Sequence, residues 1–212
     1  MVRRFALAAA LAAAWVLPLS AAGTAVAQDA TTECASAPWL EPLAAAREAA
    51  ETAAQTASDA PAWLTTELTD ACSGEAFALA DFAGKTIYIE GMATWCTNCR
   101  QQLGRVKEAA AQISDAEKED VVFVALSSEV DLPREALAQY AVDNEFPFVF
   151  AVMTAEMLQT MAEDLGQEIA VPPAMPLLIV APDGTIGELH TGGTSAEDLL
   201  ALLAAAKETT AS

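Results

Sequence analysis

The sequence predicts an α/β sandwich in which helices flank a central mixed β-sheet. Short apolar segments typical of buried strands alternate with longer segments whose apolar residues recur at helical spacing. A Pro182-Asp183-Gly184 turn between two apolar segments indicates an antiparallel hairpin near the C-terminus. Alternating residues in Glu67–Thr69 and Ala76–Leu79 predict a second, N-terminal β-hairpin.

The remaining elements follow from their residue patterns. Thr86–Met92 is rich in Ile and Tyr, and Val121–Leu126 is a continuous apolar run of the kind that a buried parallel strand needs. Between these strands, Cys96 to Ile113 carries apolar side chains on one helical face. The other expected elements are a helix from Pro133 to Val142, a strand Phe148–Val152, a helix Ala155–Leu165, strands Leu177–Val180 and Thr185–Leu189, and a last helix through Ala206 that Ser195 caps.

The first 27 residues have the features of a signal peptide. Arg3 and Arg4 precede an apolar run from Phe5 to Leu19, and Ala25-Val26-Ala27 fits a small-x-small cleavage site. An uncleaved membrane anchor is the alternative, but the run is shorter than the roughly 20 residues that a spanning helix needs. We therefore expect export to the periplasm or another extracytoplasmic compartment, with no stable membrane insertion after cleavage.

Residues 28–61 differ in composition from the rest of the chain. They are rich in Ala, Thr and acidic residues and contain few large apolar side chains. Pro42 can begin a helix that continues to about Ser58, and Ala60-Pro61 marks the end of the segment. The expected organisation is thus a signal peptide at 1–27, an Ala-rich helical extension at 28–61, and one α/β domain at 62–212.

The charge of the chain argues against some classes of partner. Its formal net charge is −20, and Arg3 and Arg4 lie in the segment that cleavage would remove. Such a surface repels phosphate backbones and anionic lipid headgroups, so we expect no nucleic-acid partner. The sequence shows no Gly-rich phosphate-binding loop, and we expect no cofactor.

Two of the four cysteines form a C-x-x-C motif, Cys96-Thr97-Asn98-Cys99, where a strand is expected to turn into a helix. Unpaired N–H groups and the helix dipole at such a place stabilise a thiolate, the attacking species in disulfide exchange. We expect Cys96 to be an exposed nucleophile and Cys99 to resolve the mixed disulfide. A permanent disulfide would close only a tiny loop, and a zinc site lacks a second ligand pair, since His190 is the only histidine.

Two distant segments resemble the TlpA-like branch of the thioredoxin superfamily. The first runs from Phe77 through the C-x-x-C motif to Arg100, and the second is Met175–Gly184. The resemblance covers about residues 64–206 and implies a thioredoxin fold with an inserted βα element within Val142–Leu165. It also implies a thiol–disulfide oxidoreductase that reduces disulfide-containing exported proteins and receives electrons from a membrane thiol transporter. Cytochrome c maturation is one destination that the resemblance suggests.

The resemblance assigns substrate-binding roles to Trp95, Met175 and Pro176. Pro176 matches the family's cis-proline, which faces the redox cysteines, and the backbone of the residue before it pairs with a bound substrate chain. A cis bond has a low cost only before proline, although a simple strand-edge proline is the alternative. Pro172 and Pro173 compete for the role, and the apolar run that follows Pro176 favours Pro176.

Glu90 lies six residues before Cys96 in an otherwise apolar strand. In thioredoxins the matching position holds a buried acid that shuttles a proton to the resolving cysteine. Burial would raise the pKa of Glu90 and make it a base for Cys99; a strand-end glutamate that reaches solvent is the alternative. Gln102 and Gly104 stand where many members have Glu and Pro, and Thr97-Asn98 differs from the dipeptides common in the family. The redox potential therefore does not transfer.

The other two cysteines, Cys34 and Cys72, stand alone in the sequence. We expect them to form a structural disulfide that ties the extension to the N-terminal hairpin. A loop of that size contributes about 3–4 kcal/mol by the chain-entropy estimate. Exchange of one of them with the C-x-x-C pair or with a partner protein is the alternative.

Methionines suggest an alternative function. Met153, Met157 and Met161 recur at four-residue spacing, and Met92 and Met175 flank the expected site. Thioether sulfurs together with Cys96 and Cys99 would suit a copper(I)-binding, metallochaperone-like module. Core packing is the commoner role of methionines at helical spacing, so we expect no metal site.

Overall fold

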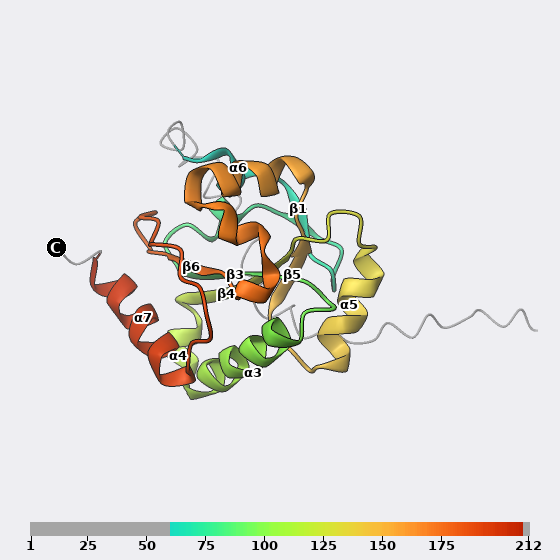
Figure 1. The fold of residues 1–212 in the computed structure, drawn as a ribbon. Coiled ribbons are helices and arrows are strands. Elements are labelled where there is room, and N and C mark those ends of the chain that lie inside the picture. The colour runs from blue at the N-terminus through green and yellow to red at the C-terminus, as the bar shows by residue number, and fades with distance from the viewer. Residues whose placement is uncertain (1–59, 210–212) are drawn as a thin grey trace, which may run out of the picture. The chain divides into compact units, whose positions relative to one another are not determined.

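A four-stranded mixed sheet with the strand order β5-β4-β3-β6 lies at the centre of the fold (Figure 1). The computed structural model describes residues 60–209 of the chain. β3 (Thr86–Met92) and β4 (Val121–Ser127) are parallel, and β4 is parallel to β5 (Val149–Val152). β6 (Leu177–Val180) runs antiparallel to β3. The expected α/β sandwich around a mixed sheet is confirmed.

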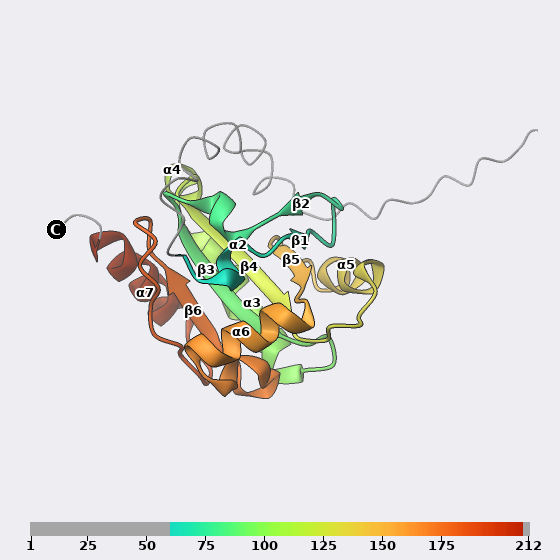
Figure 2. The ribbon, with the colours of Figure 1, turned by 90° about the horizontal axis from the view of Figure 1, so that it is seen from above.

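Helices cover both faces of the sheet, as Figures 1 and 2 show. One face packs against α3 (Thr97–Gln112), α5 (Arg134–Asp143) and α7 (Ala196–Thr209). The opposite face packs against α2 (Ala62–Thr65) and α6 (Ala155–Leu165). β5 and α6 form the expected inserted βα element. The short helical segments are η2 (Leu79–Phe82), α4 (Asp115–Lys118), η3 (Gln167–Ala170) and η4 (Pro172–Ala174).

The alternation of side chains along β3 divides the core into two layers. Tyr88 and Met92 face the layer that contains α3 and α7, whereas Ile87 and Ile89 face the layer that contains α2 and α6. Every residue of β3 and of β4 is buried. Burial on both faces explains why these strands are continuous apolar runs, and it makes Glu90 an exception that needs a chemical reason.

The N-terminal hairpin is confirmed, with shorter strands than expected. β1 (Leu68–Thr69) and β2 (Ala76–Phe77) are antiparallel, with Leu68 opposite Phe77. The buried Asp70 fixes the turn, because its carboxylate accepts hydrogen bonds from the Cys72 and Ser73 N–H groups. The second strand ends early because the Asp81 carboxylate accepts from the Ala78 N–H and begins η2.

The expected strand Thr185–Leu189 is wrong. The segment forms only two isolated bridges with β6, Val180 to Ile186 and Leu177 to His190. Between these bridges β6 advances three residues while the returning segment advances four, which is the count of a β-bulge. Gly187 lies in this irregular part, and its N–H donates to the Ile179 carbonyl at 2.8 Å. The alternating residue pattern does not reveal the extra residue.

Several expectations concern the N-terminal segment. The signal peptide at 1–27, the extension at 28–61 and Cys34 lie outside the described residues, except for the last two positions of the extension. Within residues 60–209, the structure contains no helix with the length and apolar character that crossing a bilayer requires.

Two glycine substitutions should change stability in opposite directions. A Cβ at Gly187 would lie 2.9 Å from the Ile179 carbonyl oxygen, whereas a Cβ at Gly104 in α3 meets nothing within 4 Å. We expect Gly187→Ala to lower the free energy of unfolding by about 1–3 kcal/mol. We expect Gly104→Ala to raise it by about 0.5–1 kcal/mol, because alanine is the better helix former. Urea unfolding of both variants checks this, and equal effects would contradict the bulge geometry.

Candidate active site

The segment between β3 and α3 places Cys96 at the N-cap of α3. The Cys96 N–H donates to the Ala93 carbonyl at 3.0 Å, which closes the turn after β3. The carboxylate of Glu129, in the loop after β4, accepts hydrogen bonds from the N–H and the hydroxyl of Thr94. The Cys96 sulfur in turn accepts a hydrogen bond from the Cys99 N–H at 3.1 Å. The expected strand–turn–helix setting of the motif is confirmed.

Cys96 and Cys99 are joined by a disulfide, with their Cα atoms 5.3 Å apart. Cys99 is fully buried, and its sulfur lies 3.0 Å from the Pro172 carbonyl oxygen. The expectation that Cys96 is exposed is wrong for this oxidised state, because only 3% of the residue is accessible. The Cys96 sulfur is bonded to Cys99 and accepts a hydrogen bond from its N–H at the first turn of α3.

Three large hydrophobic side chains are exposed among the described residues. They are Trp95 (64%), Val171 (48%) and Val130 (38%). Trp95 precedes Cys96, Val171 precedes Pro172, and Val130 follows Glu129 in the loop that binds Thr94. Each is therefore a sequence neighbour of Cys96 or of a residue that contacts Cys99 or the turn before Cys96.

Pro176 differs from its expected conformation. No peptide bond among residues 60–209 is cis, so the Met175–Pro176 bond is trans. Met175 instead adopts a left-handed conformation, with φ 51°, and this reverses the chain between η4 and β6. The Met175 N–H already donates to the Pro172 carbonyl at 2.8 Å, so in this conformation it is not free to pair with a substrate. The Pro176 carbonyl accepts from the Gly91 N–H at 2.9 Å, which joins it to the end of β3.

Glu90 is fully buried on the face of β3 that also carries Tyr88. The Tyr88 hydroxyl donates to one Glu90 carboxylate oxygen at 2.7 Å, and the other oxygen has no hydrogen-bond partner. Burial raises the pKa of Glu90 to about 8, although the Tyr88 hydrogen bond and the charge of Arg105 act to lower it. The alternative of a solvent-exposed glutamate is therefore wrong, and Glu90 is mostly protonated at pH 7.

The sequence interpretation assigned no role to three residues around this site, namely Tyr88, Arg105 and Glu129. Tyr88 had a visible signal, because it lies two positions before Glu90 on the same face of the strand. Arg105 has its head group on Gln102, which is a polar residue in the apolar stripe of α3. Glu129 had no local signal, because only the fold brings it to Thr94.

The second cysteine pair stays a prediction. Cys72 is half-buried and disulfide-bonded in the structure. Its expected partner, Cys34, lies outside the described residues.

The methionines on and before α6 pack in the core. Met153, Met157 and Met161 are buried between the sheet and α6. Nothing in the described part of the chain places these sulfurs beside Cys96 or Cys99, so no structural observation favours the copper(I) alternative.

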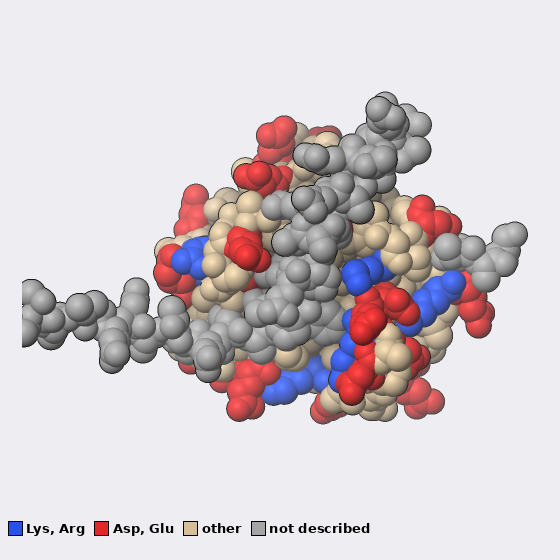
Figure 3. Space-filling model, turned by 180° about the vertical axis from the view of Figure 1, so that it is seen from behind, with Lys and Arg blue, Asp and Glu red and all other residues tan. Residues whose placement is uncertain are grey.

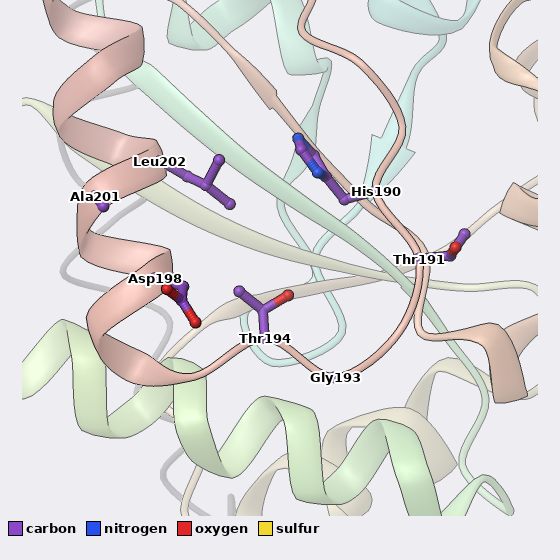
Figure 4. Close-up of a pocket in the computed structure, with 7 residues that line it drawn as sticks. All are labelled: His190, Thr191, Gly193, Thr194, Asp198, Ala201 and Leu202. Atoms are coloured by element: carbon purple, nitrogen blue, oxygen red, sulfur yellow. The ribbon is translucent and has the colours of Figure 1, made fainter.

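A hollow on the described surface lies between the segment after β6 and α7 (Figure 4). It has a volume of about 440 Å³, with His190 and Thr194 on one side and Asp198 and Leu202 on the other. Neither Cys96 nor Cys99 lines it, so this hollow is not part of the candidate active site.

Comparison with known proteins identifies the family. Residues 49–202 match the family model described as Redoxin. The chain belongs to the Redoxin family. No curated protein matches the chain.

Solved structures share the fold. A thioredoxin-family thiol:disulfide interchange protein from Chlorobium tepidum TLS has a TM-score of 0.56 and 16% identity, and the match covers 66% of this chain and 92% of that one. A secreted Mycobacterium tuberculosis disulfide oxidoreductase homologous to E. coli DsbE has a TM-score of 0.52 and 18% identity, with 68% and 97% covered. The MTB protein DsbF has a TM-score of 0.53 and 20% identity, with 69% and 98% covered.

The comparisons and the site agree on one chemistry. The Redoxin match spans the C-x-x-C motif, and the structures show that the fold is that of thioredoxin. The chain is thus a Redoxin-family thiol–disulfide oxidoreductase with a thioredoxin fold, and its C-x-x-C cysteines, Cys96 and Cys99, form a disulfide.

The raised pKa of Glu90 predicts a pH-dependent stability that Glu90→Gln removes. The folded state keeps the Glu90 proton from pH 4.5 up to about pH 8, whereas the unfolded state loses it near pH 4.5. Raising the pH through this window therefore destabilises the wild-type fold, by up to about 5 kcal/mol at pH 8 and above. Glu90→Gln mimics the protonated side chain, so it should equal the wild type below pH 4.5 and exceed it at pH 8.

Urea midpoints at several pH values measure this difference. Glu163→Gln, at an exposed position on α6, is the matched control and should follow the wild type at every pH. Parallel curves for Glu90→Gln and the wild type would show that Glu90 does not titrate as the structure implies.

Proposed function

We propose that this oxidoreductase is exported and reduces disulfides of extracytoplasmic proteins through a Cys96/Cys99 dithiol–disulfide cycle. The observation that carries the proposal is the position of Cys96 as the N-cap of α3, bonded to a Cys99 that is fully buried one turn deeper. The two cysteines hold different positions on the helix, so we expect Cys96 to attack a client and Cys99 to release it.

Each cycle moves two electrons and two protons to the client. The reduced Cys96 thiolate attacks a client disulfide and forms a mixed disulfide, and the client's first sulfur leaves as a thiolate that takes up a proton. Cys99 then passes its proton to Glu90 and attacks the Cys96 sulfur, and the client's second sulfur leaves as a thiolate that takes up the second proton. The Cys96–Cys99 disulfide that remains needs a dithiol reductant, for which we propose a membrane thiol transporter.

A carboxylate near the motif favours the reducing direction. Glu129 binds Thr94, two residues before Cys96. Negative charge near a thiol disfavours its thiolate. A dithiol whose reduced form is only weakly stabilised gives up its electrons more readily. The hydrogen bond from the Cys99 N–H to the Cys96 sulfur acts in the opposite direction, and we expect the Glu129 carboxylate to dominate.

Export and client choice rest on the sequence and its charge. The N-terminal features from Arg3 to Ala27 support export to the periplasm or another extracytoplasmic compartment. Figure 3 shows Asp and Glu side chains spread over the described part of one face, with Lys and Arg between some of them. With a net charge of −20, the chain should bind neutral or basic clients faster than acidic ones.

Reduction of insulin by dithiothreitol tests the catalytic assignment. We expect the wild-type chain to accelerate it, and both Cys96→Ser and Cys99→Ser to abolish the acceleration. Cys72→Ser, which leaves the redox pair intact, should retain it. Unchanged activity in Cys96→Ser would contradict the proposal.

The redox potential tests the direction. Equilibration of the Cys96–Cys99 pair with glutathione or dithiothreitol should give a potential below about −200 mV, nearer to thioredoxin than to DsbA. A value near −120 mV would instead assign the chain to disulfide formation.

A further inference from the structure

A buried polar group on α3 lies over the Glu90 face of the sheet. Gln102 is fully buried, and its side-chain oxygen accepts hydrogen bonds from three donors. Two of them, Nε and Nη2, belong to Arg105, and the third is the Thr194 N–H at 3.0 Å. Arg105 Nε also donates to the Thr194 carbonyl at 2.9 Å, so the guanidinium joins α3 to the segment before α7.

These contacts occupy one end of the Gln102 amide. Its oxygen is held by Arg105 and Thr194. Its nitrogen is a buried donor without a hydrogen-bond partner, and one Glu90 oxygen is a buried acceptor without one. Tyr88 is affected by both residues: its hydroxyl donates to Glu90, and burial raises its pKa well above the usual value while Gln102 acts to lower it.

Leaving a buried donor and a buried acceptor unpaired is unfavourable, because each group has lost its hydrogen bonds to water and gained none in return. Such groups in a native structure call for an explanation, and a catalytic role is one of the recognised ones. A protonated Glu90 gains little from a second donor nearby, but an ionised Glu90 gains a great deal, since hydrogen bonds to charged groups are the strong ones.

We propose that Gln102 and Arg105 are positioning residues for proton transfer at Glu90, with Arg105 holding the Gln102 amide so that its N–H groups stabilise the ionised Glu90 carboxylate. The inference rests on the proposed role of Glu90 as the base for Cys99. To accept the Cys99 proton, Glu90 must first be ionised, so any group that stabilises its carboxylate increases the fraction of chains that can resolve a mixed disulfide. Gln102 and Arg105 themselves gain and lose no proton.

Of the groups around Glu90, those on α3 are the ones suited to stabilise its ionised carboxylate. On the neighbouring strands, Glu90 lies opposite Ala125 of β4 and Leu177 of β6, which are apolar. Tyr88 on its own strand supplies one hydroxyl. Burial raises the pKa of Tyr140 on α5, and the charges of Arg100, Glu90 and Glu129 also affect it. The buried Tyr140 hydroxyl has no hydrogen-bond partner. Arg105 is the cation that lowers the pKa of Glu90.

Arg105→Gln tests the inference through a pH profile. Removing the cation should raise the pH midpoint of mixed-disulfide resolution by at least half a pH unit. At pH 7, where only a minor fraction of Glu90 is ionised, the rate should fall about three- to tenfold, and it should recover above pH 9. Lys107→Gln is the matched control, because it removes a cation from the exposed Lys107–Glu145 ion pair on the same helix. Its profile should match the wild type.

A direct titration separates positioning from a merely structural effect. In protein labelled with ¹³C at the glutamate carboxyl carbons, the Glu90 signal is the one that Glu90→Gln removes. Its midpoint should rise in Arg105→Gln and stay unchanged in Lys107→Gln. If Arg105→Gln does not fold, the same titration is done on Gln102→Met, which keeps the side-chain volume but loses the amide. The Glu90 midpoint should rise in this variant too.

The outcomes distinguish this inference from the proposed function. An unshifted Glu90 midpoint in folded Arg105→Gln or Gln102→Met overturns the inference while leaving the Cys96/Cys99 cycle in place. A wild-type chain without disulfide reductase activity overturns the proposed function, whatever the Glu90 midpoint does.

Discussion

The hydrogen bond from the Cys99 N–H to the Cys96 sulfur, at the first turn of α3, is the constraint on which the site depends. It exists only because β3 ends at Met92 and the chain turns directly into the helix. The turn is held from outside by Glu129 through Thr94, and Pro172 covers the Cys99 sulfur. Cys96 is thereby the N-cap of α3 and follows the exposed Trp95, whereas Cys99 lies inside the helix, and both cysteines are buried in the same core layer.

The burial that stabilises the sheet also raises the pKa of Glu90. β3 is buried on both faces because helices cover both, and an acid placed in such a strand holds its proton to a much higher pH than an exposed one. The chain accepts an unpaired buried oxygen on Glu90 and an unpaired buried nitrogen on Gln102. The hydroxyl oxygens of Thr86 and Tyr140 are likewise buried without a hydrogen-bond partner, so these four atoms are the part of the described core that packing alone does not explain.

Residue patterns predicted most of the fold, because strands buried on both faces and helices with one apolar face leave clear periodicities. Thr86–Met92, Ala155–Leu165 and Leu177–Val180 have the predicted bounds. The bulge near Gly187 and the trans bond at Pro176 were missed, because both depend on contacts with β6 and η4 that no local pattern encodes. The motif located Cys96 and Cys99, but it could not reveal that pairing buries Cys96. The roles of Glu129 and Arg105 come from loops and helices that only the fold brings together.

The proposed cycle needs two thiols of unequal reactivity, with Cys96 as the attacking group and Cys99 as the protected one. Reacting the reduced Cys99→Ser and Cys96→Ser variants with a small aromatic disulfide at pH 7, and mapping the adduct by mass spectrometry, measures this inequality directly. We expect rapid adduct formation at Cys96 in Cys99→Ser, and reaction at Cys99 at least about tenfold slower in Cys96→Ser, since a buried thiol is poorly accessible. Equal rates, or faster reaction at Cys99, would contradict it.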